Sequence, residues 1–115
     1  MMRHSPKPPI ILIMGVSGSG KSTTGRNLGR ALDWEYRDAD TFHPSANITK
    51  MREGMPLDDA DRWPWLDAIG AWMDDLGADR TPGIVSCSAL KRVYRDRLRS
   101  SRPNVALVYL RAVQI

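Results

Sequence analysis

The sequence lacks the features that define secreted and membrane proteins. Its only cysteine is Cys87, so no disulfide can form within the chain, as is usual in a reducing compartment such as the cytoplasm. No apolar run approaches the roughly 20 residues that a membrane-spanning helix needs. No small-residue cleavage site follows the N-terminal residues, which argues against a secretory signal. We therefore expect a cytoplasmic protein that has no membrane partner.

Acidic residues are nearly absent from the segment 91–102. This segment holds six Lys or Arg residues against a single acid, Asp96, and it accounts for the net charge of +4. Nucleic-acid-binding segments interleave such charges with aromatic residues that stack on bases, and that interleaving is missing here. We interpret the segment as a solvated helix face or a set of anion-binding side chains, and we expect no nucleic-acid partner.

The 115 residues suffice for one domain at most. Short apolar runs alternate with helix-prone segments along the chain. Strands are expected at 10–14, 34–38, 84–87 and 105–110, and helices at 21–32, 44–53, 63–78 and 89–100. The acidic residues 58–61 are expected to begin the third of these helices, and Pro64 places its regular part at 63–78. This alternation predicts an α/β fold, with a parallel sheet and right-handed crossovers.

Three local expectations accompany this fold. The Pro-rich polar residues 1–9 are interpreted as a disordered leader, and residues 10–115 as the domain. Gly25 and Gly29 lie four residues apart, which predicts close packing of their helix on the sheet. The basic helix is expected to turn four side chains inward: Leu90, Val93, Tyr94 and Leu98.

A phosphate-binding motif follows the first apolar run and opens the first helix. The G-x-x-x-x-G-K-S pattern between a strand and a helix is that of a P-loop, whose backbone N–H groups surround phosphate oxygens. Its lysine would contact the β- and γ-phosphates of ATP, and its serine hydroxyl suits Mg²⁺. The residues of this predicted nucleotide site are Gly15, Val16, Ser17, Gly18, Ser19, Gly20, Lys21 and Ser22.

Two carboxylates, Asp38 and Asp40, come at the end of the second strand. Ligands of open parallel sheets bind beyond the carboxyl ends of the strands, so both carboxylates would lie near the nucleotide. Phosphoryl transfer to an alcohol needs a group that orients or deprotonates the hydroxyl, and a carboxylate can do this. The alternative is that D-x-D is a solvated turn.

Other polar residues near the strand ends allow two interpretations each. His43 is either a ligand or base, or a packing residue at the start of a helix. Lys91 and Arg95 lie four apart just after the third strand, where they would grip a carboxylate or phosphate, or form part of a solvated basic face.

Two longer motifs make the sequence similar to a known family. His43–Met51 reads H-P-x-x-N-x-x-K-M, and Cys87–Asp96 reads C-S-A-L-K-x-x-Y-R-D. Together with the P-loop and Asp38-Ala39-Asp40, these motifs resemble the P-loop gluconokinases of the thermoresistant type, from about residue 11 to residue 110. The resemblance implies ATP- and Mg²⁺-dependent transfer of phosphate to the 6-hydroxyl of D-gluconate. Related small-molecule kinases, such as shikimate kinase, and a non-catalytic nucleotide-binding fragment are the alternatives.

The resemblance also implies roles for single residues. Lys21 and Asp40 would be catalytic, with Asp40 as the base on the gluconate hydroxyl, and Ser22 and Asp38 would serve the Mg²⁺ shell. The expected substrate-binding residues are Asp40, His43, Arg52, Lys91 and Arg95.

The family's sheet has strand order 2-3-1-4-5, and its members continue beyond the fourth strand. The resemblance therefore implies that this chain has the order 2-3-1-4 with helices on both faces, and lacks the fifth strand and the arginine-bearing lid. We expect impaired activity, and a homodimer is an open alternative. The fourth strand would be an exposed edge, which favours self-association.

Overall fold

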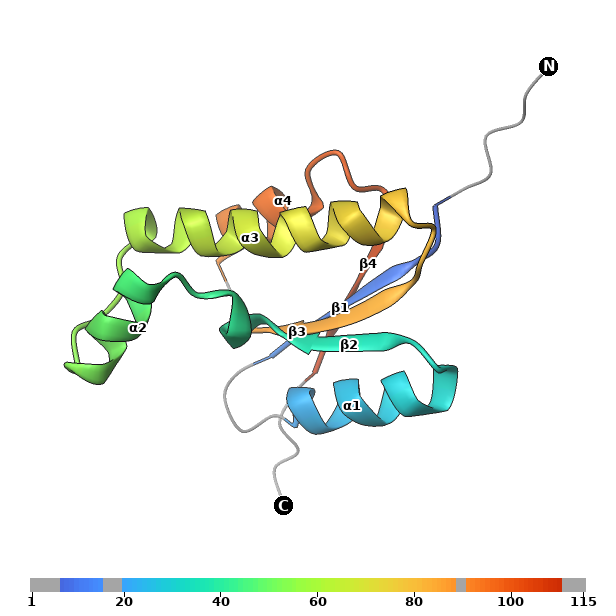
Figure 1. Ribbon diagram of the computed structural model, residues 1–115, viewed down its shortest axis with the longest axis horizontal. Helices are drawn as coiled ribbons and strands as arrows, with labels where there is room; N and C mark the ends of the chain where they lie inside the picture. The colour runs from blue at the N-terminus through green and yellow to red at the C-terminus, as the bar shows by residue number, and fades with distance from the viewer. Residues whose placement is uncertain (1–6, 16–19, 89–90, 111–115) are drawn as a thin grey trace.

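A computed structural model describes residues 7–15, 20–88 and 91–110 of the chain. Four parallel strands form the sheet, in the order β2-β3-β1-β4. Figure 1 shows α3 and α4 on one face of this sheet and α1 on the other, with α2 beyond the ends of β2 and β3. The elements are β1 (Ile10–Met14), α1 (Lys21–Leu32), β2 (Glu35–Asp38), the 3₁₀ turn η1 (Ala39–Phe42), α2 (Ser45–Arg52), α3 (Asp59–Ala78), β3 (Gly83–Cys87), α4 (Arg92–Arg99) and β4 (Val105–Tyr109). The predicted fold class and strand order are confirmed.

Strand β1 lies at the centre of the sheet and pairs with β3 on one side and β4 on the other. Its residues are almost entirely buried, as a continuous apolar run in a parallel sheet predicts. The main core fills the space between the sheet and α3. It contains Leu12 and Met14 of β1 and Leu66, Ile69 and Met73 of α3. This packing fixes α3 relative to the carboxyl ends of the strands.

Helix α1 packs closely on the opposite face, as its two glycines predict. A Cβ atom on Gly25 would overlap the ring of Tyr36 in β2. A Cβ atom on Gly29 would lie 3.0 Å from the carbonyl oxygen of Trp34. The helix ends at Asp33, whose φ of 56° is left-handed. Close packing therefore joins α1 to β2, where the second group of predicted site residues begins.

The long helix begins where its acidic residues predict, but its regular part is longer than expected. We expected Pro64 to delay the regular part to Trp63, but α3 is regular from Asp59 and contains Pro64 in its interior. Asp58 and Asp61 form a capping box, in which each side chain accepts a hydrogen bond from the other residue's backbone N–H. This cap stabilises the first turn, although proline removes one helical hydrogen bond.

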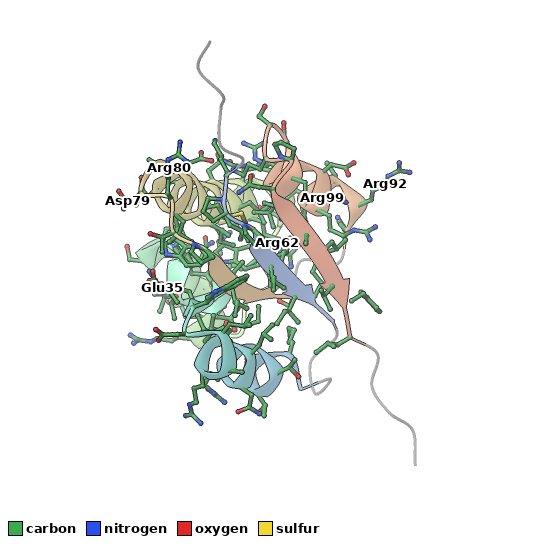
Figure 2. The ribbon with its side chains drawn as sticks, turned by 90° about the vertical axis from the view of Figure 1, so that its right-hand side faces the viewer. Glu35, Arg62, Asp79, Arg80, Arg92 and Arg99 are labelled. Atoms are coloured by element: carbon green, nitrogen blue, oxygen red, sulfur yellow. The ribbon has the colours of Figure 1, made fainter. Side chains whose placement is uncertain are left out.

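The basic helix also differs from its prediction. It begins at Arg92, and Leu90 lies outside the described residues. Tyr94 and Leu98 are buried as expected, but Val93 is 51% exposed, because it lies on the solvent side of α4. Figure 2 shows Arg92 extending outward from this helix. Acidic residues of α3 pair with three of the cations in the basic segment: Lys91 with Asp59, Arg97 with Asp67, and Arg102 with Asp74.

Of the predicted leader, residues 1–6 lie outside the described part. The carbonyl oxygens of Pro8 and Pro9 accept hydrogen bonds from Asn104 and Gly83, at 3.0 and 3.4 Å. Residues 7–9 therefore run along the sheet up to the start of β1. Among the described residues, no helix is both long and apolar enough to cross a membrane.

Candidate functional site

The predicted nucleotide loop lies between β1 and α1. Gly15 is buried directly after β1, and Gly20 is the N-cap of α1 with a φ of 86°, which L side chains rarely adopt. Val16, Ser17, Gly18 and Ser19 lie outside the described residues. No side chain in the described part of the chain caps α1, so the first backbone N–H groups of the helix can bind an anion. Lys21 is the first residue of the helix and is half-buried.

The predicted metal ligands, Ser22 and Asp38, lie together in the structure. The Ser22 hydroxyl donates a hydrogen bond to Oδ2 of Asp38 at 3.1 Å. Hydroxyl and carboxylate oxygens are the hard ligands that Mg²⁺ prefers. No group of three or more His, Cys, Asp or Glu within the described part of the chain could hold a metal ion alone. An ion between Ser22 and Asp38 would therefore take further ligands from phosphate oxygens and water.

Asp38 and Asp40 differ in their surroundings. Both carboxylate oxygens of Asp38 are engaged, because Oδ1 accepts from the backbone N–H of Asp40 at 2.9 Å. Asp40 is exposed in η1, and its carboxylate accepts no hydrogen bond from any described residue. The structure therefore leaves Asp40 available to a ligand, whereas Asp38 is held against α1.

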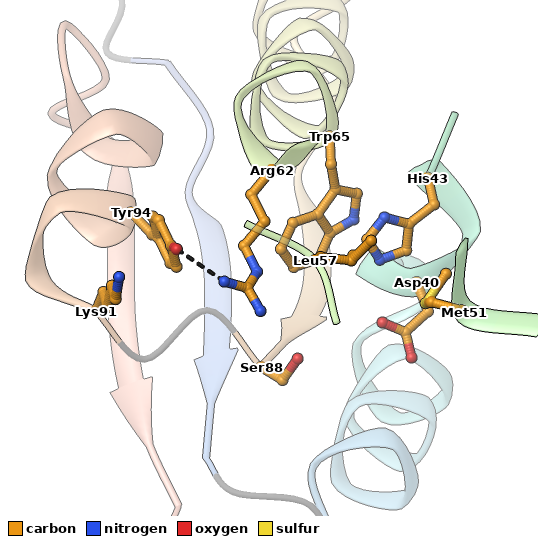
Figure 3. A pocket seen from close by; sticks show the side chains of 9 residues that line it. All are labelled: Asp40, His43, Met51, Leu57, Arg62, Trp65, Ser88, Lys91 and Tyr94. Carbon is orange, nitrogen blue, oxygen red and sulfur yellow. Dashed lines mark hydrogen bonds between the residues drawn. The ribbon is translucent and has the colours of Figure 1, made fainter. Parts of the chain in front are cut away.

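A cavity of about 380 Å³ opens beside Asp40. This volume lies within the range of about 300–1,000 Å³ that is typical of small-molecule sites. The cavity lies between η1, α3 and the N-terminal end of α4 (Figure 3). Its lining residues are Asp40, His43, Met51, Leu57, Arg62, Trp65, Ser88, Lys91 and Tyr94.

The cationic side of the cavity is held by a network between α3 and α4. Arg62 donates to the hydroxyl of Tyr94 at 3.0 Å, and that hydroxyl donates to Asp59. Lys91 forms an ion pair with the same Asp59 carboxylate at 3.1 Å. The hydrogen bonds from Tyr94 and Lys91 lower the pKa of Asp59, and the bond to Asp59 raises the pKa of Lys91. Lys91 is thus in the cavity wall but already has an anionic partner.

Arg62 is the cation that the sequence did not predict. Within the described part of the chain, its guanidinium donates only the bond to Tyr94, although an arginine has five N–H donors. Figure 3 shows the side chain reaching from α3 toward the middle of the cavity. A planar guanidinium in this position suits a carboxylate or phosphate.

His43 is in the cavity wall, as expected of a ligand, and is also packed, as expected of a structural residue. Its ring is stacked on the indole of Trp65, with ring centroids 4.4 Å apart. Burial lowers the pKa of His43 more than the nearby Asp40 raises it. Both interpretations of His43 therefore describe part of what the structure shows.

Two of the predicted substrate ligands do not line the cavity. Arg52 is exposed at the last residue of α2, and its neighbour Met51 faces the cavity instead. Arg95 lies half-buried on α4, and its Nε atom is buried without a hydrogen-bond partner among the described residues. A direct role for either residue in holding the substrate stays a prediction.

Comparison with known proteins places these features in a family context. No family model matches the chain. It is 40% identical over 104 residues to a gluconokinase of Gluconobacter oxydans, and 42% identical over 102 residues to the thermoresistant gluconokinase of Escherichia coli. The chain is thus similar in sequence to gluconokinases over most of its own length. The crystal structure of a gluconokinase from Sinorhizobium meliloti is 51% identical and superimposes with a TM-score of 0.76 over 91% of this chain.

The similarity covers nearly all of this chain but only part of each relative. The matched regions comprise 90% and 89% of this chain for the two curated relatives, and 58% of the length of each of them. For the S. meliloti structure, the matched region is also 58% of that protein. The chain therefore spans a little over half the length of the gluconokinases that it matches.

Proposed function

We propose that the chain carries the ATP- and gluconate-binding part of a gluconokinase, which phosphorylates D-gluconate to 6-phospho-D-gluconate. The observation that supports this most strongly is the cavity beside the P-loop helix, where the available carboxylate of Asp40 shares the lining with Arg62 and Lys91. A polyol with a terminal carboxylate needs both kinds of group. The chain spans 58% of the length of these two relatives, so that it phosphorylates gluconate by itself is also part of the proposal.

The nucleotide would bind at the start of α1. Gly15 to Gly20 and the first N–H groups of the helix would surround the phosphates of ATP, and Lys21 would contact the β- and γ-phosphates. Ser22 and Asp38, whose Oγ and Oδ2 atoms are 3.1 Å apart, would hold Mg²⁺, which neutralises charge on the phosphate oxygens. These two residues join α1 to β2, so the metal site would form next to Asp40.

The acceptor would occupy the cavity. Arg62 would bind the gluconate carboxylate through the guanidinium N–H groups that face the cavity, with Lys91 as a second, weaker cation because Asp59 already neutralises it. The chain of hydroxyl groups would then extend toward Asp40. In this orientation the far hydroxyl, on C6, meets the base, whereas the carboxylate stays near α4.

In the transfer step, Asp40 would accept the proton of the 6-hydroxyl as its oxygen attacks the γ-phosphorus. One P–O bond forms to the gluconate oxygen, and the P–O bond to the β-phosphate breaks. The products are ADP and the phosphate ester, and the proton leaves Asp40 to solvent. Lys21 would stabilise the charge on the transferring phosphoryl group throughout.

A coupled assay of ADP formation tests the proposal with D-gluconate, shikimate and AMP as acceptors. We expect turnover with gluconate alone, slower than that of full-length S. meliloti gluconokinase assayed in parallel. Turnover with shikimate or AMP but not with gluconate would overturn the substrate assignment. ATP binding without transfer to any acceptor would support the alternative of a non-catalytic nucleotide-binding fragment.

Two further proposals concern the setting of the protein. A single buried cysteine, Cys87, fits a reducing compartment, and we infer the cytoplasm. A homodimer is the assembly we propose to test first, because β4 is an edge strand of the sheet that the described residues form and can pair with a second copy.

A further inference from the structure

Asn47 is a buried amide that joins three elements of the acceptor site. It lies on α2 and is 2% exposed. Its Nδ2 donates to the backbone carbonyl of Asp61, in α3, at 2.9 Å, and lies 3.1 Å from Nδ1 of His43, which follows η1. A backbone carbonyl oxygen can only accept a hydrogen bond. The contact with Asp61 therefore identifies the amide atom near both residues as the nitrogen and not the oxygen.

This assignment determines the protonation state of the imidazole. An amide nitrogen carries two hydrogens and cannot accept. Nδ1 of His43 must then accept the second hydrogen from Asn47, so the ring is neutral and its own proton is on Nε2. The stack on Trp65 fixes the ring plane, and Trp65 is itself held by a bond from Nε1 to the carbonyl of Ala39 at 2.7 Å.

The Nε2–H group is the polar part of the ring that remains for a ligand. No described residue accepts a hydrogen bond from Nε2, and the ring shares the cavity lining with Asp40. In Figure 3 the two side chains come from the same end of the cavity, where η1 leads into α2. A neutral donor here complements hydroxyl or carboxylate oxygens.

The charges around His43 favour the same state. Asp40 of η1 raises its pKa, Arg62 of α3 lowers it, and burial lowers it by more than either charge does. The other charged pair nearby, Lys50 of α2 with Asp61 of α3, is joined at 2.7 Å. The pKa of His43 therefore lies below its ordinary value of 6.5, and the ring is neutral at neutral pH.

We propose that Asn47 fixes His43 as the neutral Nε2–H tautomer, so that His43 donates a hydrogen bond to an oxygen of the bound sugar acid and leaves proton acceptance to Asp40. Asn47 is thus a positioning residue and His43 a substrate-binding donor. His43 cannot be the general base in this arrangement, because neither ring nitrogen has a free lone pair. The identity of the ligand rests on the proposed function, whereas the tautomer does not.

Nitrogen-15 NMR of the histidine-labelled chain tests the tautomer without any ligand. The chain has two histidines, so a His4→Gln variant assigns the signals. We expect the neutral Nε2–H form of His43 at pH 7, with protonation below pH 6.5. A neutral Nδ1–H form, or an imidazolium at pH 7, would overturn the proposal.

An Asn47→Asp variant tests the role of the amide. A carboxylate only accepts, so it requires a proton on Nδ1 and adds a negative charge, which together raise the pKa of His43 by about 1–3 pH units. An unchanged tautomer and pKa in a folded variant would contradict a positioning role. If this variant does not fold, the wild-type spectrum still tests the tautomer, and the two His43 variants described next still test the donor role.

Titration with gluconate separates the donor role from the proposed function. His43→Gln keeps an amide donor near the Nε2 position, and His43→Leu has none. We expect the Leu variant to bind gluconate about tenfold more weakly than the Gln variant. Equal losses would remove the donor role. Absence of gluconate binding to the wild-type chain, with the Nε2–H form intact, would instead count against the proposed function.

Discussion

The two halves of the candidate site are built differently. The proposed nucleotide half offers backbone groups at the start of α1, and among its described residues the hydrogen bond of Ser22 with Asp38 ties it to β2. The acceptor half is a network of side chains from η1, α2, α3 and α4, in which Asn47, Asp59 and Tyr94 each contact more than one neighbour.

This difference fits the ligands that we propose for the two halves. Phosphate groups are the same in every nucleotide, so a fixed curve of backbone N–H groups with one lysine suffices. A sugar acid is distinguished by the position of its hydroxyls and carboxylate, which requires side chains held in fixed positions. Substitutions in the two halves should therefore have separable effects on ATP and on gluconate.

The largest effect is expected for Asp40→Asn. The amide cannot accept the hydroxyl proton, so phosphoryl transfer should fall by roughly 10²–10⁴-fold, as is usual for a positioned base. ATP and gluconate affinities should stay near those of the parent chain. The rate of transfer of a radiolabelled γ-phosphate to gluconate measures the loss. Asp79→Asn is the control, because Asp79 lies at the far end of α3. Near-normal transfer by Asp40→Asn would remove the residue from catalysis.

Lys21→Ala should weaken ATP binding by about 10- to 100-fold, the usual value of a charged hydrogen bond. Lys21 is not among the core residues, so the circular dichroism spectrum should not change. Arg30→Ala, in the last turn of the same helix, is the matched control. Loss of the folded spectrum in Lys21→Ala would show instead that the residue supports the structure.

Arg62→Gln should weaken gluconate binding by about tenfold and leave ATP binding unchanged, because it removes a cation from the acceptor half alone. Calorimetric titration with each ligand measures both. Arg97→Gln serves as control, because Arg97 forms an ion pair with Asp67 of α3 and does not line the cavity. If Arg97→Gln had the same effect on gluconate as Arg62→Gln, overall charge and not the cavity would account for binding.

A smaller, indirect effect is expected from the edge of the sheet. Strand β4 pairs with β1 on one side only, and Val108 and Tyr109 are 41% and 53% exposed. Such an edge favours self-association. Val108→Lys should therefore reduce association severalfold in sedimentation velocity, without changing either ligand affinity. A parent chain that is already a monodisperse monomer with one cooperative melting transition would contradict the argument.

The sequence predicted the parts of the site that local pattern determines. Strand–loop–helix order located the P-loop, and the rule that ligands bind beyond the carboxyl ends of parallel strands placed Asp38 and Asp40 near it. The contact between Ser22 and Asp38 confirms that these segments meet. The buried faces of α3 and the close packing of Gly25 also followed from spacing alone.

Long-range pairs were beyond the reach of such reasoning. Arg62 was not among the predicted site residues, because its place in the cavity depends on how α3 packs against η1 and α4. With the helix starting at Asp59, Arg62 and Trp65 are three residues apart on the face that lines the cavity. The partners of Asp59, in contrast, are more than 30 residues away, at the N-cap and in the first turn of α4, and no spacing within one element indicates them.

The central claim is that the cavity recognises a sugar acid. Calorimetric titration of the chain with D-gluconate and with sorbitol, a polyol of similar length without the carboxylate, tests it most directly. The account predicts that gluconate binds at least about tenfold more tightly than sorbitol, since a charged hydrogen bond to Arg62 is lost, and that Arg62→Gln abolishes this preference. Equal affinities for the two ligands in the parent chain would contradict it.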